Sequence, residues 1–152
     1  MEQDLIKKID MNKLKDFFKS IKQCYSYIPY TFKHWIFYIK EEKALYHKVT
    51  HILHDWDKLF MYALIPFVGK YRINAWHQKW SKHHPTYWKK SKDGWVQYNK
   101  NPLNVDWKSV IADWNCAPKT KLDKPLYARD TMEKYYPNFR RFIEPILDIL
   151  GL

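Results

Sequence analysis

The sequence predicts an all-α fold, a single helical-bundle domain that spans residues 1–152. Three observations favour it: the chain has only three glycines, its apolar residues recur mostly at helical spacing, and prolines separate the periodic segments. Hydrophobic residues make up 46% of the chain, which is typical of a protein that folds around a core. A length of 152 residues fits one domain.

Helices are expected in five segments of the chain. Their approximate ranges are 3–23, 32–65, 71–83, 107–117 and a last segment from about residue 138. Each contains apolar residues at helical spacing. Pro29 separates the first two helices, Pro66 and Gly69 end the second, Pro85 closes the third, and Pro118 stops the fourth.

The connections between these helices carry fewer signals. Thr31 is a suitable N-cap for the second helix, and Asn104 or Asp106 can cap the fourth. The second range is longer than a usual globular helix, so a break is expected near residues 42–49. Residues 86–103 contain scattered Gly, Asn and Pro and are expected to be irregular.

Composition narrows the environment and the partners. The longest apolar stretch, "LFMYALIPFVG", has 11 residues and is too short to span a membrane. The N-terminal "MEQDLIKKID" does not resemble a signal peptide. Cys24 and Cys116 are isolated in the sequence, which is typical of reduced thiols in a cytoplasmic protein.

Positive charge permits a polyanionic partner, although a lysine-rich surface can also serve solubility alone. The formal net charge is +11, and the segment from Lys70 to Lys92 has seven basic residues and no acidic one. Three of the seven histidines fall in the same segment. A phosphate-containing small molecule or a nucleotide is the expected partner, with nucleic acid as the alternative.

Histidine and aspartate recur in an order that predicts a metal site. The candidate ligands are His34, His54, Asp55, His77, His83, His84 and Asp113. Imidazoles and carboxylates from separate helical segments can converge on one ion, and the adjacent pair His54-Asp55 can serve one ion or bridge two. Such mixed nitrogen and oxygen ligands suit Mn, Fe, Co, Ni or Zn better than Mg. We therefore expect one or two divalent transition-metal ions.

This order resembles the HD superfamily of metal-dependent phosphohydrolases, whose motif runs H…HD…D, with H…HH inserted in the binuclear branch. "HDWDK" looks like the HDxxK form of the motif, with Lys58 as its lysine. The stretches "HDWDKLF", "AWHQKWSKHHPTYW" and "VIADW" are similar to an uncharacterised family of small HD-like domains from phages and bacteria. The resemblance covers about residues 30–117 and implies an HD-domain-like helical fold, in a bacterial cell or encoded by a phage.

The resemblance implies hydrolysis of a nucleotide-like phosphate ester. Asp55 and Lys58 are the catalytic candidates, and a solvated side chain is the alternative for Lys58. The basic segment makes Lys79, Lys82 and Lys89 candidates for binding substrate phosphate, although such a run is also typical of a charged surface. A second hypothesis is a non-enzymatic basic helical module that binds nucleic acid or a host protein, with a structural metal or none.

The sequence leaves two points about the ligand set open. On one continuous helix the 20 residues from His34 to His54 would span about 30 Å, so either the helix breaks or His47 or His51 takes the place of His34. Neighbouring residues on a helix point about 100° apart, so only one of the two histidines at positions 83 and 84 is expected to face the same way as the histidine at position 77. Burial of His54-Asp55 is expected from its apolar neighbours, Ile52, Leu53, Leu59 and Phe60.

Aromatic residues are frequent around the second histidine cluster. Trp76, Trp80, Tyr87, Trp88 and Trp95 are able to stack on a nucleobase, but packing within a small helical domain is the simpler interpretation for most of them. Trp88 and Trp95 are the exceptions, because they fall in the segment that is expected to be irregular.

Overall fold

The computed structural model describes residues 11–121 and 123–152, and most of them are helical. The helices are α1 (Met11–Tyr46), α2 (Trp56–Met61), α3 (Ile65–Val68), α4 (Lys70–Trp80), α5 (Trp107–Thr120), α6 (Ala128–Tyr135) and α7 (Arg140–Leu150). Short 3₁₀ turns, η1 (Tyr62–Leu64), η2 (Pro102–Asn104) and η3 (Pro137–Phe139), lie between them. The strands β1 (Thr86–Ser91) and β2 (Gly94–Asn99) form a hairpin, so the fold is mostly helical but not purely all-α.

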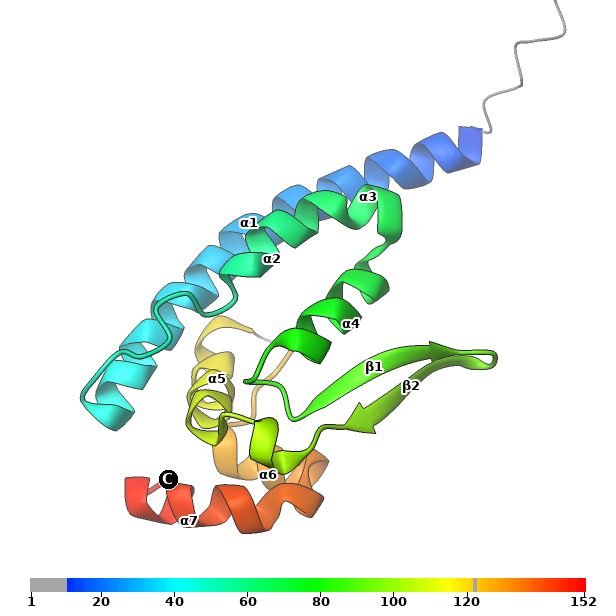
Figure 1. Ribbon diagram of the computed structural model, residues 1–152. Coiled ribbons are helices and arrows are strands. Elements are labelled where there is room, and N and C mark those ends of the chain that lie inside the picture. Colours follow the sequence, from blue (N-terminus) through cyan, green and yellow to red (C-terminus); the bar gives the residue numbers. More distant parts are fainter. Residues whose placement is uncertain (1–10, 122) are drawn as a thin grey trace, which may run out of the picture.

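Helix α1 is the scaffold against which α2, η1, α3 and α5 pack (Figure 1). The expected break at Pro29 is wrong: the helix continues through it, and Pro29 lies on an exposed position. Proline removes one backbone hydrogen bond, but packing on both sides of it holds the helix together. α3 packs on the part of α1 before Pro29, where Phe67 contacts Phe17, and α5 packs on the part after it, where Ser109 contacts Tyr38. The start of the helix expected over 3–23 lies outside the described residues.

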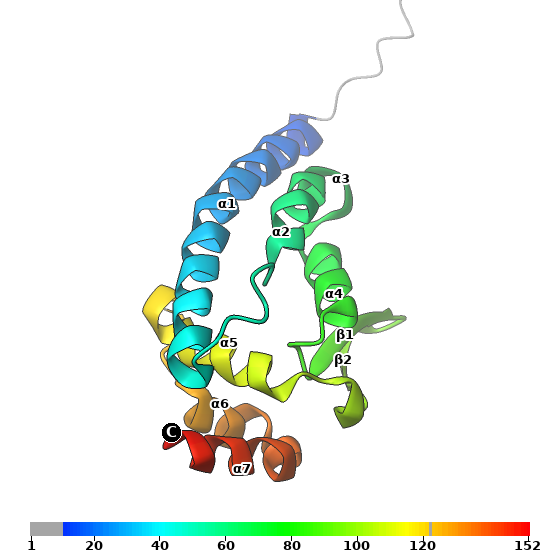
Figure 2. The ribbon, with the colours of Figure 1, turned by 60° about the vertical axis from the view of Figure 1, so that its left-hand side comes forward.

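The expected break near residues 42–49 is confirmed. α1 ends at Tyr46, and His47 adopts a left-handed conformation with φ 57°. The segment 47–55 then folds back along α1 (Figure 2). Glu42, which is 1% exposed, organises this segment by accepting hydrogen bonds from the backbone N–H groups of Thr50 and His51 at 3.0 and 3.1 Å.

The segment after this loop is less regular than expected. α2, η1 and α3 form a run of short helical pieces, and Pro66 lies in the first turn of α3 rather than ending a helix. Gly69, with φ 82°, does end this run. α4 follows but stops at Trp80, three residues before the expected end, and this releases the segment 81–85 from helical geometry.

The hairpin corrects the prediction that residues 86–103 are irregular. β1 and β2 pair in antiparallel register, from Thr86 opposite Asn99 to Ser91 opposite Gly94. Lys92 and Asp93 form the turn, and Gly94, which follows them as the first residue of β2, has φ 129°. A two-residue connection between two six-residue segments therefore favours pairing, and β1 packs against α4.

Helix α5 lies across α1 and anchors the C-terminal helices. Asp106 is its N-cap, as expected, and accepts a hydrogen bond from the backbone N–H of Ser109 at 3.1 Å. Pro118 does not stop the helix, which runs on to Thr120. The main hydrophobic core joins α5 to α6 and α7, with its buried residues including Val110, Ile111, Trp114, Ala128, Met132, Ile143 and Leu147.

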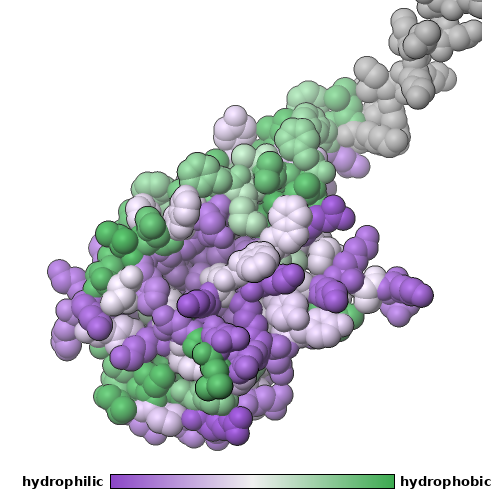
Figure 3. Space-filling view, viewed as in Figure 1, coloured by the Kyte–Doolittle hydropathy of each residue, from purple (hydrophilic) through white to green (hydrophobic). Residues whose placement is uncertain are grey.

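On the face in Figure 3, hydrophobic residues gather over α1 and α3, hydrophilic ones cover most of the middle, and smaller hydrophobic patches appear again toward the lower end. Within the described residues, no helix combines the length and the apolar character that crossing a membrane requires. Cys24 and Cys116 are both free thiols.

We expect Glu42→Gln to weaken the protein in a pH-dependent way. Burial opposes the charged form of Glu42, but the hydrogen bonds from Thr50 and His51 outweigh it and lower the pKa of the carboxyl group. The charged form therefore stabilises the fold above the ordinary pKa of about 4.3, and this contribution is lost as the pH falls through the lower folded-state pKa. Thermal unfolding between pH 3 and 7 should show a difference from wild type that is largest at neutral pH and shrinks below about pH 4. Exposed Glu133→Gln is the control, and a pH-independent difference for Glu42→Gln would contradict the prediction.

Candidate metal centre

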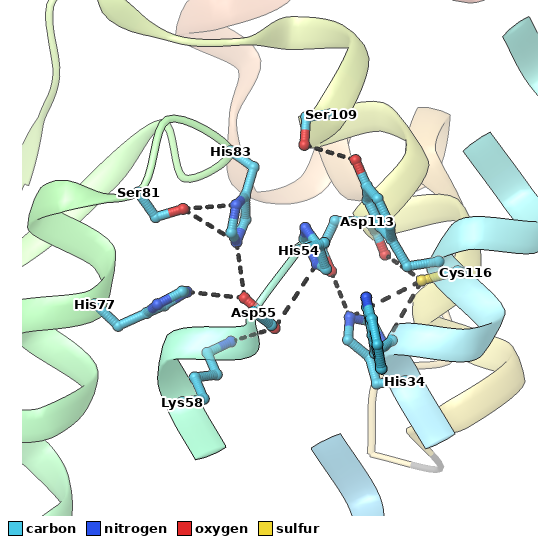
Figure 4. A network of polar contacts seen from close by, with 12 residues as sticks. His34, His54, Asp55, Lys58, His77, Ser81, His83, Ser109, Asp113 and Cys116 are labelled. Atoms are coloured by element: carbon cyan, nitrogen blue, oxygen red, sulfur yellow. Dashed lines mark hydrogen bonds and ion pairs between the residues drawn. The ribbon is translucent and has the colours of Figure 1, made fainter. Parts of the chain in front are cut away.

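The structure brings the seven residues predicted as ligands into one buried region, and Figure 4 labels all of them except His84. They come from separate elements: α1, the loop before α2, α4, the segment between α4 and β1, and α5. Their nitrogen and oxygen atoms form two groups, and within each group these atoms lie within 4.8 Å of one another. The members are His34, His54 and Asp113 in the first group and Asp55, His77, His83 and His84 in the second.

The first group joins α1, the folded-back loop and α5. His34 Nε2 lies 2.8 Å from Asp113 Oδ1, and His54 Nε2 lies 3.6 Å from the same oxygen. The end of α1 at Tyr46 makes this possible, because the loop returns His54 to within 5.7 Å of the His34 ring, centroid to centroid. The question of how His34 reaches His54 is therefore answered by the break in the helix.

The second group gathers around one oxygen of Asp55. His77 Nε2 and His83 Nε2 lie 3.0 and 3.1 Å from Asp55 Oδ1, and His77 Nε2 lies 3.1 Å from His84 Nε2. The expectation that only one of His83 and His84 joins His77 is wrong. α4 ends at Trp80, so helical geometry does not separate the two neighbouring imidazoles.

Asp55 lies between the two groups. Its Oδ1 faces His77 and His83, whereas its Oδ2 lies 3.7 Å from His54 Nε2 and 2.6 Å from Lys58 Nζ. The backbone of Asp55 is left-handed, with φ 59° and ψ 9°, an uncommon conformation that aspartate tolerates better than most residues. This turn starts α2 and directs the carboxylate into the interior.

Unsatisfied polar atoms at this position test whether a metal ion fits. Among the described residues, His54 Nδ1 and Nε2 and Asp55 Oδ1 are buried without a hydrogen-bond partner. Native proteins pair nearly all such atoms, since an unpaired buried group costs about 1–3 kcal/mol. The contacts of His77 and His83 with Asp55 Oδ1 are short but lack hydrogen-bond geometry. A cation would satisfy these lone pairs together.

The distances also suit ligands of a common ion. Bonds of about 2.0–2.2 Å to a transition metal place two neighbouring ligand atoms roughly 3.0–3.6 Å apart. The contacts of Asp55 Oδ1 and of His54 with Asp113 fall in this range, and that of His34 with Asp113 lies just below it. The residues therefore fit one or two divalent ions, and Asp55 is placed to contact both.

Neighbouring groups orient the imidazoles. Asp57 Oδ2 accepts a hydrogen bond from His77 Nδ1 at 2.7 Å, which leaves the Nε2 lone pair free to bind a metal. Thr120 Oγ1 lies 3.0 Å from His34 Nδ1, and Ser81 Oγ lies 2.5 Å from His83 Nδ1. Such outer partners set the tautomer and the ring orientation of metal ligands.

The His54 ring is held by stacking rather than by hydrogen bonds. The ring of Tyr38 is parallel to it, with the centroids 3.6 Å apart, and Tyr38 is itself fixed by a 2.7 Å hydrogen bond between its hydroxyl and Ser109 Oγ. Stacking leaves both nitrogens of His54 free.

The protonation states favour metal binding. Burial lowers the pKa values of His34 and His84, and burial together with the nearby His54 lowers the pKa of His83 to about 4. Burial acts against the charged forms of Asp55 and Asp113, but Lys58 beside Asp55 and Lys121 near Asp113 help to hold both pKa values well below the usual range. At neutral pH these imidazoles are therefore neutral and the carboxylates are ionised.

The prediction that His54-Asp55 is buried is confirmed, since each residue is 4% exposed. The apolar neighbours that led to this prediction do not cause the burial, because Ile52, Leu53 and Phe60 are exposed. The surrounding helices bury the pair instead.

His47 and His51 do not join the two groups. His51 lies between carboxylates outside the centre, with Nδ1 2.6 Å from Glu42 Oε1 and Nε2 2.8 Å from Asp106 Oδ2. These contacts tie the loop that carries His54 to both α1 and the start of α5, which is a structural role.

Two cavities reach the centre. One, of about 500 Å³, is lined by His54, His77 and His83, and also by Lys82, Asp57 and Asp106. The other, of about 410 Å³, is lined by His77, His84 and Asp113. Four lysines also line the second cavity, together with the carboxylate of Asp123: Lys58, Lys70, Lys121 and Lys124.

The structure separates the lysines predicted to bind phosphate. Lys82 borders the first cavity, whereas Lys79 and Lys89 lie in a surface pocket that contains no member of the two ligand groups. Sequence reasoning missed Lys121 and Lys124, which follow α5. Their charge was outside the acid-free segment, and only the return of the chain after α5 brings them to the centre.

Comparisons with models of known protein families, with curated proteins and with solved structures find no match to this chain.

Added metal should stabilise the protein through His54. A ligand that binds only the folded state at 100 times its Kd stabilises it by about 2.7 kcal/mol, which for a domain of this size raises Tm by roughly 5–10 °C. We expect Mn²⁺, Co²⁺, Ni²⁺ or Zn²⁺ to give such a shift in metal-stripped wild type and a much smaller one in His54→Ala, measured by differential scanning fluorimetry. His47→Ala is the matched control, because His47 is exposed and outside both groups. Equal metal-induced Tm shifts in His54→Ala and His47→Ala would show that the metal binds away from His54.

Proposed function

We propose that this protein is a metal-dependent phosphohydrolase of the HD type that acts on a nucleotide-like phosphate ester. The observation that carries the proposal is the position of Asp55. Its two carboxylate oxygens face two groups of buried histidine and aspartate side chains, whose free lone pairs suit divalent ions. The order of these residues along the chain, H…HD…H…HH…D, supports the same reading.

The chemistry is the addition of water to a phosphate ester. Water oxygen bonds to phosphorus, the bond between phosphorus and the ester oxygen breaks, and the alcohol leaves with a proton that came from water. A divalent ion held by the two groups would lower the pKa of water and polarise the phosphoryl oxygen. The chain itself contributes ionised carboxylates, which carry negative charge, and neutral imidazoles, which add no charge.

Charge favours the 410 Å³ cavity as the site for the substrate phosphate. Four lysines line it against the carboxylates of Asp113 and Asp123, whereas the 500 Å³ cavity has Lys82 against Asp57 and Asp106. A phosphate dianion is attracted to the first arrangement and repelled by the second. Lys58 links this cavity to the centre, because it borders the cavity and contacts Asp55 Oδ2 at 2.6 Å.

Lys58 and Lys121 are suited to neutralise the charge of a bound phosphate. Burial disfavours the charged form of Lys58, but Asp55 outweighs it and raises the pKa of the ammonium group, so Lys58 carries a positive charge at neutral pH. Positive groups that are fixed before the substrate arrives stabilise the charge that develops on phosphoryl oxygens.

The openness of the centre argues against a purely structural metal. Structural sites of transition metals are closed by four protein ligands, commonly with cysteine among them. Here the ligands are histidine and aspartate, and both groups border cavities large enough for a small molecule. This arrangement supports the enzymatic hypothesis over a non-enzymatic nucleic-acid-binding or protein-binding module.

We expect Asp55→Asn and Asp57→Asn to differ in severity. Asp55 faces both groups, so its replacement should remove metal binding and reduce turnover to background, whereas Asp57 only orients His77 and its replacement should cost roughly 10–100-fold. Bound metal is measured by elemental analysis, and turnover is measured with an aryl phosphate and a nucleotide panel. Circular dichroism verifies folding. Full turnover in a folded Asp55→Asn protein would refute the proposed centre.

Lys121→Ala should weaken substrate binding and leave metal binding unchanged. A hydrogen bond to a charged group contributes about 1.5 kcal/mol or more, so KM should rise about tenfold or more, and the effect should be larger at low salt. Lys89→Ala is the matched control, since Lys89 lies outside both cavities at the centre. If Lys89→Ala raised KM more than Lys121→Ala, the phosphate would instead bind at the basic segment from Lys70 to Lys92.

A further inference from the structure

An aromatic slot lies beside the lysine-lined cavity. It has a volume of about 220 Å³ and is lined by Tyr71, Asn74, Gln78, Trp88 and Trp95. In the hairpin, Trp88 is opposite Gln97 and Lys90 is opposite Trp95, so both indoles stand on the same face. β1 packs on α4, as Figure 1 shows, so the slot forms where the hairpin meets that helix.

The slot adjoins the proposed phosphate cavity through α4. Asn74 and Gln78 are one helical turn apart and line both spaces. The lysine-lined cavity in turn contains His77, His84 and Asp113 of the metal centre. The metal centre, the lysine-lined cavity and the aromatic slot therefore follow one another around α4. The two amides lie between the cavity and the slot.

Gln78 has an unpaired atom at this junction. Its side-chain Oε1 is buried and, within the described part of the chain, accepts no hydrogen bond. A buried acceptor without a donor is costly, so it calls for an N–H group from a bound molecule. Among the described aromatic residues, neither Trp88 nor Trp95 stacks on another ring, and both line the slot.

We propose that the slot binds the base of a nucleoside 5′-phosphate, that the base carries an exocyclic amine, and that Gln78 Oε1 accepts a hydrogen bond from this amine while the phosphate lies in the lysine-lined cavity. This inference rests on the proposed function and adds the substrate class. Glutamine and asparagine amides pair in this way with the amine and ring nitrogen of adenine.

The size of the slot supports a single ring system. Complete sites for drug-sized ligands measure about 300–1,000 Å³, so 220 Å³ is small for a whole nucleotide. The neighbouring 410 Å³ cavity supplies the space and the positive charge for the sugar and the phosphate. Indole faces stack on any base, which gives affinity, and the amides of Asn74 and Gln78 provide the selectivity.

The test measures binding of a non-hydrolysable methylene phosphonate analogue of AMP to metal-loaded protein by isothermal titration. Trp88→Ala should raise its Kd roughly 5- to 150-fold, which corresponds to about 1–3 kcal/mol for the loss of one stacking partner. Trp80→Ala should change it less than about twofold, because Trp80 lines the other cavity. A larger effect of Trp80→Ala would place the base in the 500 Å³ cavity and overturn the proposal.

Gln78→Met tests the amine contact separately from folding. Removing an unpaired buried oxygen should not lower Tm, yet the variant should bind the AMP analogue and the corresponding purine riboside analogue, which lacks the amine, equally well. Wild type should prefer the AMP analogue at least about fivefold, as expected for one hydrogen bond. Equal binding of the two analogues by wild type would overturn the role of Gln78.

Glycerol 3-phosphate, which has no ring, separates this inference from the proposed function. If wild type hydrolyses phosphate esters and Trp88→Ala slows glycerol 3-phosphate and AMP alike, the base subsite is wrong and the hydrolase stands. If no ester is hydrolysed with any metal but the AMP analogue binds in a Trp88-dependent way, the subsite stands and the hydrolase is wrong.

Discussion

The buried carboxylate of Asp55 is the constraint on which the rest of the structure depends. A carboxylate that is 4% exposed keeps its charge only if other charges and dipoles replace the water it has lost. Lys58 supplies one positive charge at 2.6 Å, but Oδ1 has no hydrogen-bond partner among the described residues and faces the nitrogens of His77 and His83 instead. The fold therefore concentrates polar groups around one point, an arrangement that a bound cation would stabilise.

The elements around this point each satisfy one geometric demand. α1 has to end at Tyr46 so that the loop returns His54 toward His34, and Glu42 and Asp106 hold that loop through His51. α4 has to end at Trp80 so that the next turn places two adjacent histidines in one group. The irregular parts of this fold are thus concentrated where ligands are delivered, and the long helices α1 and α5 serve as their rigid support.

The two sides of the centre differ in charge, so the proposed phosphate substrate would approach from the lysine-lined side. Lysines gather around the cavity that His84 and Asp113 line, and carboxylates around the cavity that His54 and His83 line. Desolvation by the surrounding atoms, together with the neighbouring Lys121, lowers the pKa of the Lys124 ammonium group. Positive groups held so close together destabilise the free protein and favour an anionic ligand.

The sequence alone determined the identity of the candidate ligands, because metal chemistry selects residue types and all seven predicted side chains lie in the two groups. It also determined the helical majority and the break after residue 42, since apolar spacing and length limits act locally. It did not determine how the ligands divide into groups, and it missed the helix that passes through Pro29 and the hairpin at Asp93-Gly94. Tertiary packing decided these features. The contacts of α1 with α3 and α5 outweigh the local cost of Pro29, and Lys121 reaches the centre only because α5 lies across α1. Local pattern cannot report a contact between residues that the chain separates by several helices, because that proximity is created by packing the helices together.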